Sequence, residues 1–136
     1  VMFSTMHGNQ ILATRSENIP TREWQPRPSR GRTRTPQKLR QIFFDATRDR
    51  QSGTIYLKIV NEAGTPQNIN IQISGASKIK PDGEATVLRA NNPDDTNSIQ
   101  EPRNIVPVTE AVSGLSANFT RDFPPYSITV LKLRTE

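Results

Sequence analysis

The sequence contains no cysteine, and this absence removes several kinds of chemistry at once. Disulfide bonds, thiolate metal sites and a cysteine nucleophile are excluded. Only one histidine is present, His7, and its MHGNQ context supplies no partner for nucleophilic catalysis. We therefore interpret His7 as a surface or turn residue. No clustered metal ligands and no phosphate-binding glycine loop occur, so we expect neither a metal nor a cofactor.

Long apolar runs are also lacking. No segment approaches the roughly 20 apolar residues of a membrane-spanning helix, so we expect no membrane partner. The stretch from Val1 to Phe3 is too short and too mixed for a signal peptide. These features do not fix the compartment, and we favour an extracellular or periplasmic location over a cytoplasmic one. With 136 residues, 32% of them hydrophobic, the chain suits one domain whose core excludes part of the sequence.

Acidic residues are scarce at the start of the chain. Residues 1–40 hold eight basic and two acidic residues, whereas residues 41–136 hold ten and eleven. Prolines at 20, 26, 28 and 36 fix φ, and residues 15–41 show no period of 2 or 3.6. We predict that residues 15–41 form an extended, irregular arm or linker, the second part of an N-terminal segment that spans residues 1–41. The arginines of its RPSRGRTR run would pair with phosphates and Trp24 would stack on a base of a nucleic acid. Positive charge confined to one arm is weak evidence for such binding, so we expect no nucleic-acid partner.

From residue 42 the sequence has the pattern of β-strands. TIYLKIV places Ile55, Leu57 and Ile59 on one face, and QNINIQI does the same for its isoleucines. With NEAGTP between them, residues 53–73 predict a hairpin. Further strands are expected near residues 42–44, 84–90, 118–123 and 127–134. No segment after 42 predicts a helix of ten residues, so we predict an all-β sandwich over residues 42–136.

The last predicted strand, SITVLKLR, has an irregular apolar pattern. Ile128 and Val130 share one face, whereas Leu131 and Leu133 do not keep the same alternation. Either both faces of this strand are covered, or a bulge near Val130 shifts the register.

Three carboxylates crowd into NNPDDTNSIQEP, residues 91–102. Glycosidases use a pair of carboxylates about 5–5.5 Å apart when they retain configuration, and Asp94, Asp95 and Glu101 are candidates. However, Asn and Asp side chains also hold turns by bonding their own backbone. We interpret the segment as a structural loop built on Asp95, Asn97 and Pro102.

Three stretches resemble a known family. NNPDDTNSIQEPRNIVPV and the terminal FPPYSITVLKLR are similar to the C-terminal region of α-L-arabinofuranosidases of glycoside hydrolase family 51. MFSTMHGNQILATRSENIPTREWQP resembles the segment through which those enzymes leave their catalytic barrel. Residues 30–35 match least well and are interpreted as a variable insert.

The resemblance implies a jelly-roll-like sandwich that packs on a catalytic (β/α)₈ barrel. That barrel would carry two glutamates and release terminal arabinofuranosyl residues from plant cell-wall arabinan or arabinoxylan with retention. A barrel needs about 250 residues, so this chain would be a fragment, a processed piece or a truncated product. Residues 1–4 would form the end of the last barrel helix, and residues 8–40 would run along the barrel. No glutamate of this chain stands in the barrel motif, so we expect no catalytic residue here.

Two other functions stay open at this point. A carbohydrate-binding module would need aromatic platforms, for which Trp24, Tyr56 and Tyr126 are the candidate contacts. In the resembling family a strand from the enzyme's N-terminus commonly completes the sandwich. Without it an open sheet edge would favour a self-associating protein, with a second copy of the chain as partner.

Overall fold

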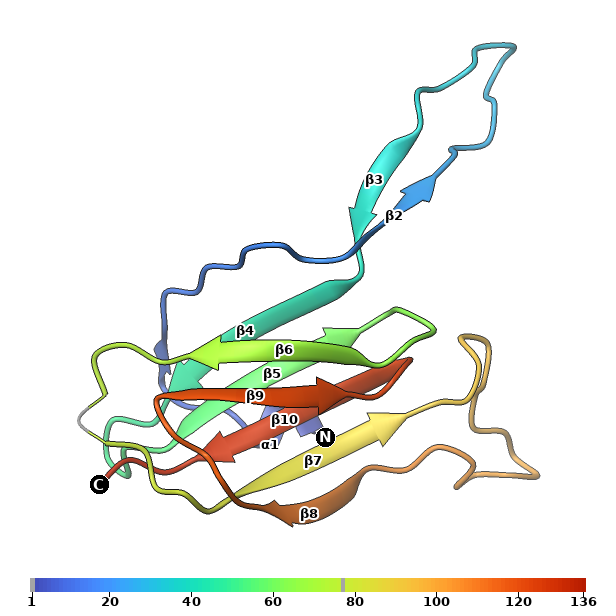
Figure 1. Cartoon of the computed structure of the whole chain (residues 1–136). Coiled ribbons are helices and arrows are strands. Elements are labelled where there is room, and N and C mark those ends of the chain that lie inside the picture. The colour runs from blue at the N-terminus through green and yellow to red at the C-terminus, as the bar shows by residue number, and fades with distance from the viewer. Residues whose placement is uncertain (1, 77) are drawn as a thin grey trace.

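The computed structural model describes residues 2–76 and 78–136, and its body is an all-β sandwich of two layers (Figure 1). This confirms the fold class expected from the apolar alternation. One short helix precedes the strands, and Val1, expected to share it, lies outside the described residues. The elements are α1 (Met2–Thr5), β1 (Gln10–Ile11), β2 (Thr21–Trp24), β3 (Gln37–Arg40), β4 (Ile42–Arg48), β5 (Ile55–Asn61), β6 (Gln67–Gln72), β7 (Gly83–Arg89), β8 (Val108–Val112), β9 (Asn118–Phe123) and β10 (Ser127–Leu133).

The larger layer is a six-stranded sheet in the order β1-β4-β5-β10-β7-β8, and the smaller layer is the β6–β9 pair. All of these pairings are antiparallel. The chain crosses between the layers after β5, β6, β8 and β9, as expected of a jelly-roll-like sandwich (Figure 1). β1 joins the larger sheet from within the first 41 residues. The domain boundary at residue 41 stays a prediction.

The core lies between the two layers. β9 contributes Phe119 and Phe123, and β10 contributes Leu131 and Leu133, all at most 9% exposed. The predicted inner face of β5, built from residues 55, 57 and 59, is buried against them. Burying one such side chain is worth about 1.5–3 kcal/mol, so this interface accounts for much of the stability of the body.

The irregular pattern of β10 arises because both of its faces are covered. Val130 is only 2% exposed and lies on the outer face, opposite the core face that carries Leu131 and Leu133. Pairing with β5 and with β7 runs without interruption from Ser127 to Lys132, so the alternative of a bulge is wrong. A strand at the centre of a sheet with both faces covered reads as a nearly continuous apolar run.

The predicted hairpin over residues 53–73 is wrong. β5 pairs with β4 and β10, whereas β6 pairs with β9 in the other layer. The two apolar faces pack against each other across the core instead of lying side by side. The connection is an arch held by buried Asn61, whose amide donates to the carbonyls of Thr65, Phe123 and Pro124 and accepts from Ala63 N.

The prediction of an irregular arm is wrong for residues 21–24 and 37–40, which are strands. β2 and β3 form an antiparallel hairpin that projects from the body (Figure 1). At its tip Ser29 pairs with Arg32 around Arg30 (φ 52°) and Gly31 (φ 71°). Two consecutive residues with positive φ characterise the two-residue turn that suits the twist of a hairpin. At its base Gln41 N donates to Pro20 O over 2.9 Å.

Candidate functional site

The loop after β7 is organised by its own side chains. The Asp95 carboxylate accepts hydrogen bonds of 2.9 Å from the backbone amides of Asn91 and Asn92. The bond from the Asn92 amide, supported by that from Asn91, lowers the pKa of Asp95 below its ordinary value. A general acid near neutral pH needs a raised pKa instead. Asp95 therefore has the electrostatics of a turn-holding carboxylate.

Farther along the loop, Asn97 imitates a strand partner. Its side-chain oxygen accepts from Ile105 N over 2.7 Å, and its amide donates to Ile105 O over 2.9 Å. Ser98 accepts from Glu101 N over 2.9 Å. Asp94, Glu101 and Pro102 are all exposed. That the loop serves structure rather than catalysis stays a prediction, and these bonds give it a physical basis.

The three candidate aromatic contacts lie on separate parts of the molecule. Trp24 is 41% exposed on β2, in the projecting hairpin. Tyr56 lies on β5 opposite Lys132, at the far end of β10 from Tyr126, which precedes Ser127. Five residues of strand separate those two ends, about 17 Å. No common sugar-binding platform results from this arrangement.

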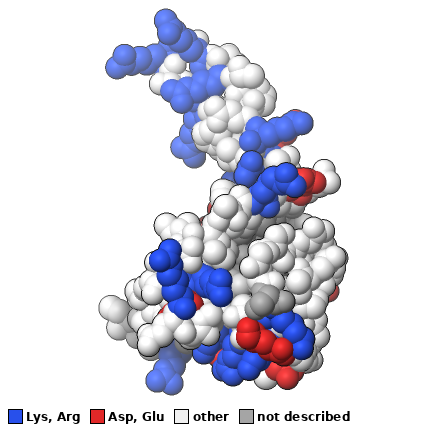
Figure 2. Space-filling model, turned by 90° about the vertical axis from the view of Figure 1, so that its left-hand side faces the viewer, with Lys and Arg blue, Asp and Glu red and all other residues white. Residues whose placement is uncertain are grey.

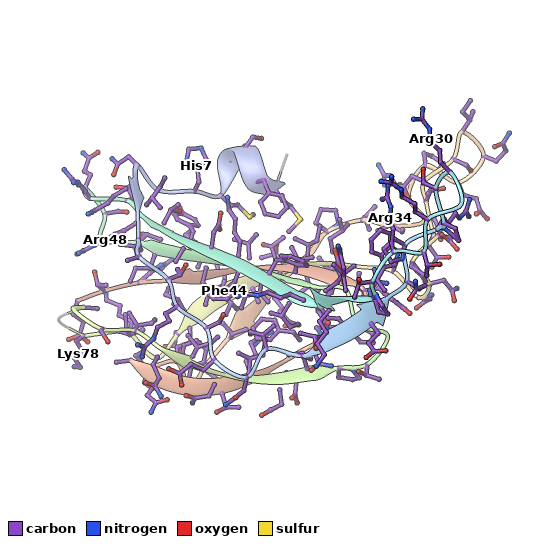
Figure 3. The ribbon with its side chains drawn as sticks, turned by 90° about the horizontal axis from the view of Figure 1, so that it is seen from above. His7, Arg30, Arg34, Phe44, Arg48 and Lys78 are labelled. Carbon is purple, nitrogen blue, oxygen red and sulfur yellow. The ribbon has the colours of Figure 1, made fainter. Side chains whose placement is uncertain are left out.

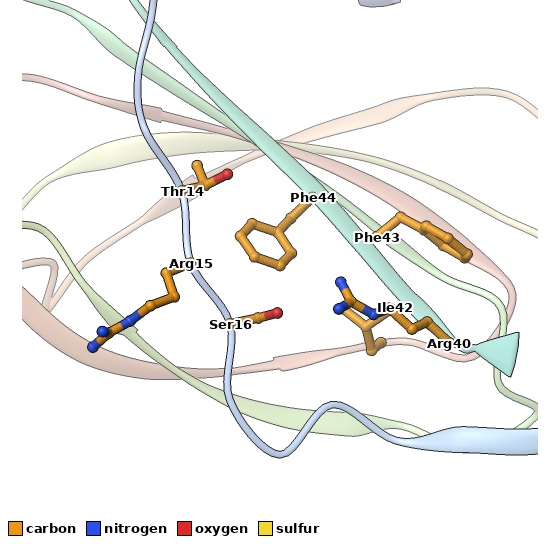
Figure 4. Close-up of a pocket in the computed structure, with 7 residues that line it drawn as sticks. All are labelled: Thr14, Arg15, Ser16, Arg40, Ile42, Phe43 and Phe44. Atoms are coloured by element: carbon orange, nitrogen blue, oxygen red, sulfur yellow. The ribbon is translucent and has the colours of Figure 1, made fainter. Parts of the chain in front are cut away.

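His7 and the pockets provide no convergent acids. His7 is exposed beside α1, far from Arg30 and Arg34 of the hairpin (Figure 3), with Nδ1 3.1 Å from Gly8 O. A pocket of about 390 Å³ lies between the 14–16 segment and β4, where Phe44 points toward that segment (Figure 4). Its lining contains no carboxylate: Thr14, Arg15, Ser16, Arg40, Ile42, Phe43 and Phe44.

A second pocket of about 230 Å³ lies beside α1 and holds one carboxylate, Glu84. Lys132 and Arg134 lie 3.3 and 3.8 Å from it. Among residues 2–76 and 78–136 no group of three His, Cys, Asp or Glu is suited to a metal ion. Within the same residues, no helix has the length and apolarity to cross a membrane.

The outer face of the larger sheet carries a partly exposed apolar row. Phe43 pairs with Val60, Val60 with Ile128, and Ile128 with Leu88, so one apolar side chain from each of four adjacent strands lies in line. Phe43 is 46% exposed and the other three are half-buried. Four strands span about 14 Å. Its composition makes this row a candidate contact surface.

The four-residue helix α1 covers only the neighbouring row of that face. Lys58 is 8% exposed beneath it, and its Nζ donates to Phe3 O over 3.4 Å and lies 4.9 Å from the Phe3 ring centroid. Both contacts stabilise a cation, and they fix the first turn of the chain to the centre of the sheet. The sequence predicted Lys58 on the outer face but not its burial, because its neighbour Val130 is set only by the strand register.

Comparison with known proteins gives consistent matches. A family model described as the α-L-arabinofuranosidase C-terminal domain matches residues 1–127. An extracellular exo-α-L-arabinofuranosidase from Streptomyces chartreusis is 28% identical over 88 residues, which are 65% of this chain and 10% of that protein.

Solved structures give the same fold. An arabinose-bound α-L-arabinofuranosidase of glycoside hydrolase family 51 aligns with 99% of this chain and 18% of its own, at a TM-score of 0.74 and 23% identity. The thermostable family 51 enzyme from Thermotoga petrophila aligns with 95% of this chain and 26% of its own, at a TM-score of 0.72 and 13% identity. The chain thus spans about a tenth to a quarter of the length of the proteins it matches.

Proposed function

Because the chain belongs to the α-L-arabinofuranosidase C-terminal domain family, we propose that it is the accessory β-sandwich domain of such an enzyme and is not catalytic by itself. The parent enzyme would release terminal α-L-arabinofuranosyl residues from arabinan or arabinoxylan with retention of configuration. A separate catalytic barrel would carry both glutamates of that reaction. This chain would support the barrel and fix its orientation.

The observation that carries this proposal is the apolar row Phe43–Val60–Ile128–Leu88 on the outer sheet face. It lies beside α1, the part of the chain that we interpret as the approach from the barrel. Lys58 anchors that helix to the same face through Phe3. A rigid connection and an apolar surface at one place suit a permanent domain interface, whose buried centre is depleted in charge.

The absence of catalysis is tested directly with the isolated chain. Incubation with 4-nitrophenyl α-L-arabinofuranoside should release no nitrophenol above the buffer rate. Turnover at the rate of an ordinary glycosidase, in the range of about 1–1,000 s⁻¹, would overturn the proposal.

The interface is tested by adding the chain to the catalytic portion of the parent enzyme, produced without it. The Ile128→Lys variant should bind that portion at least tenfold more weakly, because it places a charge in the middle of the apolar row. The Gln72→Lys variant adds the same charge at an exposed position of β6, in the other layer, and should bind normally. Equal binding by both variants would remove the outer face from the interface.

A further inference from the structure

The β2–β3 hairpin is paired in one register at its base and at its tip. Thr21 pairs with Arg40 and Trp24 with Gln37, and the pairing of Ser29 with Arg32 at the tip keeps the same register. The turn between them contains only Arg30 and Gly31. Residues 25–28 and 33–36 form no strand, so the register is set at the base and at the tip.

The hairpin carries cations without counterions. Between residues 21 and 40 there are seven basic side chains and one acidic one, Glu23. All seven basic residues are exposed, and within the described part of the chain none of their side chains has an ion pair or hydrogen bond. Figure 2 shows the basic side chains gathered over the hairpin. They are Arg22, Arg27, Arg30, Arg32, Arg34, Lys38 and Arg40.

Basic residues recur along the returning arm of the hairpin, at positions 32, 34, 38 and 40, with Pro36 between the two pairs. Lys38 and Arg40 lie on one face of β3, about 6.6–6.8 Å apart, because alternate residues of a strand share a face. Figure 3 shows Arg30 and Arg34 extending from the hairpin on one side. This is a linear positive array, which fits a linear polyanion better than a small ligand.

We propose that this hairpin is an attachment surface for a carboxylated polysaccharide. Guanidinium groups pair with carboxylates in a two-point geometry, and a polymer brings several such weak pairs together. The choice of a glycan over other polyanions rests on the proposed function, since the parent enzyme would act on polysaccharides. Binding of a charged polysaccharide goes beyond the proposed function, because hydrolysis of a neutral arabinofuranoside does not require it.

Nucleic acid fits the hairpin less well. Single strands are bound by a cationic track together with aromatic side chains on which bases stack. Trp24 shares its strand face with Gln37 and Leu39, so it lies opposite Lys38 and Arg40. No aromatic platform accompanies those two cations. The body, with ten basic and eleven acidic residues, does not continue a positive surface.

The test compares two polymers that differ only in charge. The whole chain is titrated calorimetrically with polygalacturonate and with the same polymer after full methyl esterification, in 20 and 300 mM NaCl. We expect binding to the charged polymer at low salt, loss of most of it at high salt, and no binding to the ester. No binding to the charged polymer, equal binding to the ester, or tighter binding to a single-stranded oligonucleotide at equal anion concentration would each overturn the proposal.

Matched charge variants locate the surface. Removing three hairpin cations should weaken binding about tenfold, since each exposed pair contributes a few-fold. Removing three exposed cations of the body lowers the net charge equally and should change binding less than twofold. Equal losses in both would indicate general attraction and reject the hairpin. The hairpin variant carries Arg27→Gln, Arg32→Gln and Arg34→Gln, and the body variant Lys80→Gln, Arg89→Gln and Arg103→Gln.

Either result leaves the arabinofuranoside and domain-association assays untouched. A failure here would therefore remove the attachment surface without removing the accessory role. Binding here with turnover by the isolated chain would do the reverse.

Discussion

The sandwich body and the β2–β3 hairpin are both antiparallel β-structure, but different forces specify them. In the body, alternating apolar residues from two layers meet, and Phe123, Leu131 and Leu133 have no exposed surface. In the hairpin, every residue of β2 is exposed and the charge is almost entirely positive. The body holds its shape through burial, the hairpin through its turn and its ladder. An isolated two-stranded hairpin is marginally stable in water, so the two regions should respond differently to the same kind of change.

The largest difference should come from removing an aromatic side chain. Phe123→Ala leaves a cavity at the centre of the core and should lower the free energy of unfolding by about 3–5 kcal/mol. Trp24→Ala removes a larger ring from the hairpin and should leave the unfolding of the body within about 0.5 kcal/mol. Urea unfolding followed by far-ultraviolet circular dichroism measures both. Similar losses would mean that the hairpin is part of the core.

The next effect concerns the arch at Asn61. Asn61→Ala leaves three carbonyl oxygens and the amide of Ala63 without their side-chain partner, and the bonds to Phe123 O and from Ala63 N are buried. We expect the free energy of unfolding to fall by about 2–3 kcal/mol, again in urea. Asn70→Ala breaks bonds among exposed side chains of β6 and β9 and should cost less than about 0.5 kcal/mol. Equal effects would contradict the role assigned to the arch.

Two glycines with positive φ give a smaller, matched comparison. Gly53 (φ 70°) lies in the turn before β5, where an added Cβ would meet the Thr135 hydroxyl, whereas Gly31 (φ 71°) has open space. Gly53→Ala should lower the free energy of unfolding of the body by about 1–2 kcal/mol. Gly31→Ala carries similar backbone strain but should change only the hairpin, seen as loss of amide protection in β2 and β3 by hydrogen exchange. A fall in body stability for Gly31→Ala would refute the independence of the two regions.

The smallest expected effect is the pH response of the loop at Asp95. The folded pKa lies below the ordinary 3.8, so the charged carboxylate favours the ordered loop. This contribution is complete above the unfolded pKa and is lost as the pH falls through the folded pKa. The Asn91 and Asn92 amide proton shifts should therefore change below about pH 3.8 and return on neutralisation. In Asp95→Asn these amides should show no titration in that range; an unchanged titration would assign it to another group.

The sequence was sufficient for the fold class and for most strands of the body, but β8 was not among the predicted strands. Residues 55, 57 and 59 lie on the core face as their alternation predicted, and Phe119 and Phe123 do the same on β9. Which strands pair was harder to predict from the sequence. Two amphipathic strands joined by a short connection have the same sequence pattern whether they pair in one sheet or pack face to face in two sheets. What separates the two cases is the buried Asn61, and its partners at residues 123–124 are distant in sequence.

The hairpin was not predicted because it is specified by its turn and not by a periodic pattern of apolar residues. The Arg30–Gly31 pair takes positive φ at both positions, and arginine is uncommon there. Four prolines also suggested irregular structure. The acidic and aromatic residues that were candidates for a functional site could be identified from the sequence. The apolar row of the outer face could not, because Phe43, Val60, Ile128 and Leu88 become neighbours only through the register of four strands.

The single backbone bond between Gln41 and Pro20 closes the neck of the hairpin, and Glu62 N continues this link by donating to Gln41 O. These bonds fix the first and last residues of the hairpin segment to the sandwich. We therefore expect that the residues between 20 and 41 can be lengthened, shortened or replaced without loss of the core. This segment is a suitable insertion site for a foreign epitope or binding peptide.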